Sequence, residues 1–381
     1  MHLQGFNKPE AETRVKLDIL FIIEELGDGG QERQLYYLAT MLSKTHKIGI
    51  LPFRFNPDDK YFRIMDGNIL LTIFQLKSMR KLAKVREIRT LIRESKPAVV
   101  HSFCFHLNFA TWLVSVGTET LAFGGIRSRL QWNHENSGAF GFYTSMLFPR
   151  RKISNNYLFL DGLAAFPKIL YRLFSKTYCI HNGLPINTFR YNKPDFIKET
   201  GMVKSGSISR LYGEKRIDLL IDLIYRLKQR GVSIRHKHAG AGPLLDSMKE
   251  RIRTYNLDEN FIFVGEAGNI SEFFSDCHVF IHTAEIEGCP NVTMEAMACG
   301  KPILTTNCGD TSLLVRHGVN GYVAGVNNLM ELEQYAMEMF SDEVKLKEMG
   351  KQSRLIAEQT FGLSLLMDKT LMVYRENGRG M

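Results

Sequence analysis

Short apolar segments alternate with segments of helical periodicity along this chain, and this alternation limits the possible folds more than any other feature. The first half contains a buried strand at 17–23 (LDILFII), a helix at about 31–43, a strand at about 48–53, and a helix at about 77–95 that leads through a proline into a strand at 98–101. Strand, helix and strand with apolar runs this short predict a parallel sheet with helices on its faces.

The second half repeats the alternation. Its predicted strands are 207–211, 234–239, 261–264, 279–282, 303–306 and 321–323. Its predicted helices are 216–230, a helix that ends at about 255, and 291–299. Between the halves, 182–205 is rich in Gly, Pro, Asn and Lys and is typical of a linker. We therefore expect an α/β protein of two facing domains, with its ligand in the cleft at the carboxyl ends of the strands.

The composition fits a globular protein of two ordinary domains, because 44% of the 381 residues are hydrophobic and 23% are charged. No apolar run approaches the ~20 residues that span a bilayer, and the polar start of the chain does not resemble a signal peptide. The six cysteines form no C-x-x-C pair. We therefore expect reduced thiols, a cytoplasmic protein and no metal site.

The net charge of +9 comes wholly from the first half of the chain. Residues 1–185 hold 25 Lys and Arg against 15 Asp and Glu, whereas 186–381 hold 24 against 25. A one-sided basic excess indicates an anionic partner. Charge alone leaves open a phosphorylated lipid, a membrane surface, an acidic glycan and a nucleic acid. We expect no nucleic acid, because the basic residues lack the interleaved aromatic residues on which single strands stack.

The segment 287–303, EGCPNVTMEAMACGKPI, places two carboxylates around a predicted helix start. If Asn291 caps this helix, the free amides and the positive helix end face the preceding loop and favour an anion there. Gly288 lets the backbone approach a ligand, and Glu287 and Glu295 are acceptors suited to sugar hydroxyls. A sugar nucleotide has this shape, with an anionic middle and a polyol at each end. Two glutamates at this spacing are, taken alone, more often solvated.

The same segment resembles the E-x7-E signature of glycosyltransferase family 4, the retaining GT-B enzymes. The resemblance covers about 17–325. It also rests on GGQER at 29–33, NGLP at 182–185 with Phe189, SRL with EK at 209–215, GAGP at 240–243, TNCG at 306–309 and HGVNG at 317–321.

This resemblance implies a GT-B architecture, in which two Rossmann-like domains with parallel sheets face each other across an interdomain cleft. It implies the following order: a disordered tail at 1–15, an N-terminal acceptor-binding domain at 16–185, a C-terminal nucleotide-sugar-binding domain at 186–360, and a helix in 361–381 that crosses back to the first domain.

The resemblance also implies the donor site. Glu287 would contact hydroxyls of the donor sugar and Glu295 would hold the ribose, while Arg210 and Lys215 would bind the diphosphate and stabilise the leaving nucleotide. We assign Arg210, Lys215 and Glu287 as catalytic. The remaining donor-binding residues are Gly30, Gly242, Gly288, Pro290, Asn291, Val292 and Glu295. Fixed cations can stabilise the negative charge that develops on a departing diphosphate, as a metal does in other enzymes. The chain has no D-x-D triplet, and we expect neither a cofactor nor a metal.

The acceptor side follows the family pattern less closely. His101 ends a strand in VVHSF, where Phe103 replaces a second histidine of the family, and a strand-end histidine is usually structural. Arg127 occupies the place where many relatives have a histidine near the reacting carbon. The planar guanidinium of arginine suits a phosphate or a carboxylate. We therefore predict His101 and Arg127 as acceptor-side residues.

Two basic stretches of the first half favour contact with an anionic membrane. Residues 77–96 carry eight basic and two acidic residues with an apolar stripe at helical spacing. This helix either lies on anionic lipid or covers the sheet with a solvated basic face. Residues 139–152 combine aromatic residues with Arg150, Arg151 and Lys152, as in a loop near a membrane or an acceptor.

The sequence thus predicts a metal-independent retaining glycosyltransferase. It would move a hexose from a nucleotide-diphosphate sugar to a hydroxyl of a glycolipid or polysaccharide precursor, at the cytoplasmic face of a membrane. The alternative is a catalytically silent protein of the same fold that binds a nucleotide sugar or serves as a scaffold.

Overall fold

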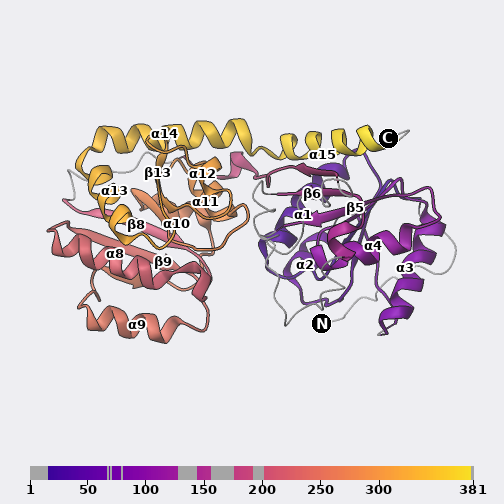
Figure 1. Ribbon diagram of the computed structural model, residues 1–381, viewed down its shortest axis with the longest axis horizontal. Helices are drawn as coiled ribbons and strands as arrows, with labels where there is room; N and C mark the ends of the chain where they lie inside the picture. Colours follow the sequence, from indigo (N-terminus) through magenta and orange to yellow (C-terminus); the bar gives the residue numbers. More distant parts are fainter. Residues whose placement is uncertain are drawn as a thin grey trace, which may run out of the picture.

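The computed structural model describes residues 16–66, 68, 71–78, 80–127, 144–155, 176–191 and 201–378. Within them the strands form two parallel sheets, one in each lobe of Figure 1. The first sheet has the order β3-β2-β1-β4-β5-β6-β7 and the second the order β10-β9-β8-β11-β12-β13. Helices cover both sheets, so the predicted α/β architecture of two parallel sheets is confirmed.

The first sheet is built around a central, fully buried strand. Its strands are β1 (Ile19–Ile23), β2 (Ile48–Pro52), β3 (Leu71–Ile73), β4 (Val99–Ser102), β5 (Leu121–Ile126), β6 (Arg151–Ser154) and β7 (Lys176–Cys179). Its helices are α1 (Gly30–Leu42), α2 (Lys60–Asp66), α3 (Lys81–Ser95), η1 (Phe105–Leu107) and α4 (Asn108–Ser115). In β1, Ile19 pairs with Ile48 on one side and Val99 on the other. Neighbouring strands on both sides and helices on both faces favour an apolar strand, as ILFII is.

The second sheet has the same construction. Its strands are β8 (Val203–Ile208), β9 (Ile234–Ala239), β10 (Phe261–Phe263), β11 (Val279–His282), β12 (Ile303–Thr306) and β13 (Gly321–Ala324). Its helices are η3 (Ile186–Thr188), η4 (Gly213–Lys215), α8 (Ile217–Gln229), α9 (Leu245–Thr254), α10 (Ile270–Ser275), α11 (Asn291–Ala298), α12 (Thr311–Leu314), α13 (Leu329–Ser341) and α14 (Glu343–Thr360).

Strand β8 lies upstream of its predicted position, because it covers Val203–Ile208 and not 207–211. Its inward side chains include Ser205 and Ser207, which are buried and hydrogen-bonded to the two ring nitrogens of His236 at 2.8 Å each. These polar residues interrupt the apolar pattern that marks a strand, so the pattern shifted the prediction downstream. Arg210 consequently lies two residues beyond the carboxyl end of β8.

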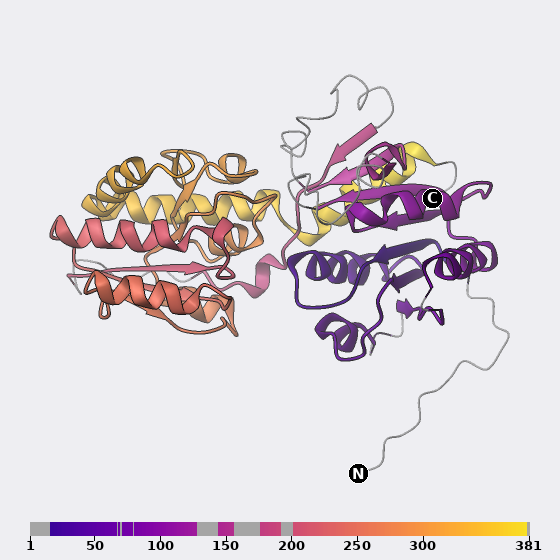
Figure 2. The same cartoon turned by 60° about the horizontal axis from the view of Figure 1, so that its bottom comes forward.

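The C-terminal part of the chain returns to the first sheet. Helix α14 packs on the second lobe, and α15 (Leu363–Asn377) continues along the same side of the molecule onto the first (Figures 1 and 2). Tyr374 of α15 is fully buried there, and Leu366, Leu371 and Val373 join the same apolar core. In the part of the chain that the structure describes, no helix has the length and apolarity to cross a membrane.

Two further predictions concerned the tail at 1–15 and the basic stretch at 139–152. The tail at 1–15 and residues 139–143 lie outside the described residues. The prediction that Lys152 belongs to a loop near a membrane or an acceptor is wrong, because Lys152 is a fully buried residue of β6 that donates to the carbonyl of Pro149 at 2.5 Å. Pairing of β6 with both β5 and β7 places it inside the sheet.

Candidate functional site

The first acid of the motif meets two cations at the carboxyl ends of the second sheet. Lys215 Nζ lies 2.6 Å from Glu287 Oε1, and His282 Nε2 lies 3.3 Å from the same oxygen. Lys215 ends the η4 turn, which follows β8, whereas His282 is the last residue of β11. The three side chains come from the ends of the neighbouring strands β8 and β11 and the segments that follow them, and parallel topology brings these strand ends to one edge of the sheet.

Burial and charge pairing keep this trio ionised. Burial opposes ionisation of Glu287, but His282 and Lys215 together lower the pKa of its carboxyl well below the ordinary value. Burial likewise opposes protonation of His282, but its interactions with Cys308 and Glu287 raise its pKa. Two cations around one carboxylate leave a positive charge in excess, which suits an anionic ligand.

Hydrogen bonds hold the η4 turn against the segment that follows β11 and leads into the motif. The hydroxyl of Thr283 donates to the carbonyls of Lys215, at 3.3 Å, and Arg216, at 3.0 Å. The amide of Glu285 donates to the carbonyl of Glu214 at 2.8 Å. The Lys215 ammonium is therefore held beside Glu287 by the strand ends themselves.

Arg210 lies at a separate part of the same edge. It is exposed, with its guanidinium 5.1 Å from the centre of the Tyr212 ring. It lines a pocket of about 480 Å³ together with the GAGP loop and Glu266. A Cβ on Gly242 would lie 2.6 Å from the carbonyl oxygen of Leu211, so only glycine allows this close approach of the two loops.

The second acid of the motif, Glu295, is enclosed between the two lobes. It lies in α11 with 2% of its surface exposed, and its carboxylate forms an ion pair with Arg33 of α1. Burial raises the pKa of Glu295 to about 7, although the guanidinium acts in the opposite direction. A ribose can reach this carboxylate only if Arg33 moves aside.

Asn291 does not cap α11, contrary to our expectation. Pro290 occupies the N-cap position, and Asn291 is the first helical residue and makes no capping hydrogen bond. Its side chain instead connects the lobes, since its oxygen accepts from Asn182 Nδ2 at 2.7 Å and its nitrogen donates to the Gly30 carbonyl at 3.4 Å. A Cβ on Gly30 would lie 2.7 Å from Asn291 Nδ2, so a larger residue here would displace the Asn291 side chain.

The other predicted donor-binding residues of the motif are Gly288, Pro290 and Val292, and they lie in or beside the loop that precedes α11. Gly288 is buried, and its carbonyl accepts from the amide of Asp310 at 2.9 Å. Pro290 is buried as well, whereas Val292 is partly exposed and packs on the apolar core beneath the helix.

The two predicted acceptor-side residues lie next to each other at the carboxyl edge of the first sheet. His101 is fully buried among Phe21, Phe103 and Phe123. Its Nδ1 forms a 2.7 Å hydrogen bond with the hydroxyl of Tyr374. Burial, followed by the charge of Arg127, lowers the pKa of His101 well below the ordinary value. In this arrangement His101 anchors α15 through Nδ1, while its buried Nε2 has no hydrogen-bond partner.

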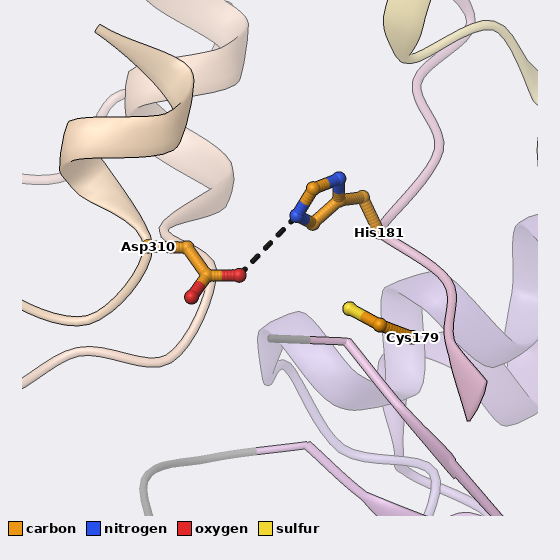
Figure 3. Close-up of side chains that lie close together, drawn as sticks. All are labelled: Cys179, His181 and Asp310. Carbon is orange, nitrogen blue, oxygen red and sulfur yellow. Dashed lines mark hydrogen bonds and ion pairs between the residues drawn. The ribbon is translucent and has the colours of Figure 1, made fainter. Parts of the chain in front are cut away.

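One cluster among the described residues has the donor atoms to hold a metal. It consists of Cys179, His181 and Asp310, whose candidate ligand atoms lie within 4.8 Å of one another (Figure 3). His181 Nε2 lies 3.2 Å from Asp310 Oδ2 and so joins the segment after β7 to the loop after β12. The positive charge of Arg127 interacts with the Cys179 thiol. That charge opposes a divalent cation here, and the cluster serves as a polar contact between the lobes.

Sequence reasoning assigned no role to three residues that the structure places at this site. Arg33 stood in the GGQER segment, and His282 ended the strand before the motif. Gln34 follows Arg33 and forms two hydrogen bonds to the backbone of Gly183, at 2.8 and 2.9 Å. The sequence signal that could have indicated these three residues was a polar side chain at the end of a strand or at the start of a helix.

Comparison with known proteins relates this chain to glycosyltransferases. The family model described as Glycosyl transferases group 1 matches residues 192–355. EpsF of Bacillus subtilis strain 168, which carries a glycosyltransferase assignment, is 24% identical over 316 residues, or 76% of this chain and 79% of EpsF. The solved structure of Anabaena HepE in complex with UDP has a TM-score of 0.79 at 18% identity, covering 94% of this chain and all of that one. Sucrose-phosphate synthase from Thermosynechococcus elongatus has a TM-score of 0.76 at 14% identity, covering 94% and 98%. The fold is therefore GT-B.

Proposed function

Because the chain belongs to the glycosyl transferases group 1 family, we propose that it transfers a hexose from a nucleotide-diphosphate sugar to a hydroxyl of a glycolipid or polysaccharide precursor, with retention of anomeric configuration. The acceptor domain would be 16–185 and the donor domain 186–360. The observation that carries the proposal is the contact between Lys215 and Glu287, 2.6 Å long, in front of α11.

The donor would lie along this edge of the second sheet. The pocket beside Arg210 and Gly242 takes the nucleotide, and the diphosphate crosses the start of α11 towards Lys215. Glu287 accepts hydroxyls of the hexose, and Glu295 accepts the ribose hydroxyls once Arg33 has moved. The complex of HepE with UDP supports a nucleotide of this kind.

The transfer would proceed through a state with oxocarbenium character. The bond from the anomeric carbon to the phosphate oxygen breaks, and its electron pair stays on the diphosphate. The acceptor oxygen forms its bond on the same face, and its proton passes to the departing phosphate. Lys215, Arg210 and the helix start stabilise the developing charge, and we propose that no metal is required.

Relatives in polysaccharide synthesis support a glycan product. One is a Salmonella typhi Vi polysaccharide biosynthesis protein, and another is a Staphylococcus aureus poly(ribitol-phosphate) N-acetylglucosaminyltransferase. The basic face of α3 would attract the protein to an anionic membrane that carries the acceptor. A catalytically silent nucleotide-sugar binder remains the alternative, and retention of Lys215, Arg210 and both acids argues against it.

Thermal shift with a panel of UDP-, GDP- and dTDP-sugars tests the donor assignment. A donor at about 100 times its dissociation constant should stabilise the protein by ~2.7 kcal/mol. Release of free nucleotide in the presence of membrane extract, unaffected by EDTA, would establish metal-independent transfer. Binding without any turnover across acceptor extracts would favour the silent alternative, and no stabilisation by any donor would refute both.

A further inference from the structure

Arg127 is a largely enclosed cation at the boundary between the lobes. It follows β5, whose neighbours β4 and β6 end at the same edge of the sheet. Its guanidinium lies over the ring of Phe103, with 4.2 Å from Cζ to the ring centre. Its Nε is buried and has no hydrogen-bond partner.

Within the described part of the chain, the groups that attract Arg127 most strongly are a phenol and three thiols, not carboxylates. These groups are Tyr374, Cys179, Cys104 and Cys289. Burial raises the pKa of Cys104 to about 12 and raises those of Cys289 and Tyr374 further. These three groups are therefore neutral near pH 7. No carboxylate within the described residues forms an ion pair with this guanidinium.

The guanidinium nevertheless stays charged. Burial lowers the pKa of Arg127 only to about 10, so neutralisation cannot relieve the cost of enclosing it. Contact with one aromatic face offsets only part of the cost of removing a cation from water. An enclosed charge with an unused donor, and with no counter-ion among the described residues, is the arrangement expected of a residue whose partner arrives with a ligand.

We propose that Arg127 binds an anionic group, a carboxylate or a phosphate, on a sugar substrate of this transferase. The proposal rests on the proposed function and adds a substrate class to it. The anionic group is distinct from the donor diphosphate, which the Lys215 side of the boundary accommodates.

The surroundings of Arg127 place this anion near the sugar that is transferred. Arg127 interacts with the thiol of Cys289, which directly follows Glu287 and Gly288 in the motif loop. Cys289 also interacts with the charge of Glu287. The loop that precedes α11 is thus close both to the guanidinium and to the acid assigned to the sugar hydroxyls. The planar fork of Arg127 can donate two parallel hydrogen bonds to a carboxylate or a phosphate.

Matched ligand pairs distinguish whether the donor or the acceptor carries the anion. The donor pairs are UDP-glucuronate with UDP-glucose and GDP-mannuronate with GDP-mannose, whose members differ at C6 by a carboxylate and a hydroxymethyl group. The acceptor pair is glucose 6-phosphate with glucose, measured on the full chain with and without UDP. Dissociation constants are determined for wild type, Arg127→Met and the control Arg93→Met, which changes an exposed arginine of α3.

We expect wild type and Arg93→Met to bind the charged member of one pair at least tenfold more tightly, and Arg127→Met to lose that preference. A preference in the donor pairs places the anion on the transferred sugar, and one in the acceptor pair places it on the acceptor. Arg127→Lys should retain part of the preference and is the substitute if Arg127→Met does not fold.

Equal affinities of wild type within every pair would overturn the proposal, with or without folded variants. A preference that survives in Arg127→Met would overturn it too. Plain UDP, GDP and dTDP are measured in parallel. If none of them binds, the proposed function fails, while the acceptor pair without nucleotide still tests Arg127.

Discussion

Arg33 of α1 and Glu295 of α11 form an ion pair that joins the helix on the first sheet to the helix of the motif. The carboxylate is 2% exposed, so it is cut off from solvent as long as the guanidinium is in place. The residue assigned to the ribose is thus held by the opposite lobe. Nucleotide binding and the arrangement of the two lobes should therefore be coupled through Arg33.

Replacing Arg33 with Gln should lower stability and strengthen nucleotide binding. The buried carboxylate would lose its counter-ion, at a cost of about 1–3 kcal/mol, but ribose would no longer have to displace a guanidinium. Chemical denaturation and titration with the nucleotide selected by the donor panel measure both effects. Glu295→Gln is the matched variant and should weaken nucleotide binding about tenfold. Unchanged nucleotide affinity in both variants would separate this pair from the donor site.

Replacing Lys215 with Ala should mainly slow turnover. The ammonium contacts Glu287 and is positioned where the diphosphate gains charge, and the loss of one such group typically lowers kcat by about 10²–10³. Steady-state kinetics should show a smaller change in the donor KM. Lys215→Arg should recover part of the rate, and Lys228→Ala, at the far end of α8, should match wild type. Wild-type kcat in Lys215→Ala would remove the lysine from the mechanism.

Stability should decrease as the pH falls below about 6.5. Burial lowers the pKa of His238 to about 4 and that of His236 well below the ordinary value. Between pH 6.5 and 4 the unfolded chain therefore binds more protons than the folded one, and protonation favours unfolding. His238 alone should contribute about 3 kcal/mol across this range. Urea denaturation at several pH values should show a smaller slope for His238→Gln, whereas His46→Gln should keep the wild-type slope because His46 is not buried.

Replacing Tyr374 with Phe should weaken the attachment of α15 to the first sheet. The change removes the 2.7 Å hydrogen bond to His101 and keeps the ring, so we expect a loss of about 1 kcal/mol. Hydrogen exchange should rise in α15 and at the end of β4. Tyr255→Phe, in the other lobe, serves as the control. If exchange in α15 does not change, apolar packing alone holds the helix.

Several features could be predicted from the sequence because they depend on neighbours along the chain. Apolar periodicity predicted a strand at 17–23, which the structure has at Ile19–Ile23, and the family resemblance implied a helix in 361–381, which the structure has at Leu363–Asn377. The motif at 287–303 predicted a helix start beside Glu287. Strand β8 was misplaced, since its buried serines find their hydrogen-bond partners in the neighbouring strand.

The roles of individual polar side chains depended on contacts that no local pattern contains. His101 and Tyr374 are 273 residues apart, and only their meeting makes His101 an anchor for α15. Asn291 looked like a cap, but its side chain bonds to Asn182 across the boundary. Burial and the electrostatic field of distant groups decide whether a charge is solvated, paired or enclosed without a partner. Glu295 is paired with Arg33, whereas Arg127 is enclosed with a donor that has no hydrogen-bond partner. The sequence by itself therefore determined the two-sheet architecture and the chemistry of the motif, and the tertiary structure decided which of its charges are available to a ligand.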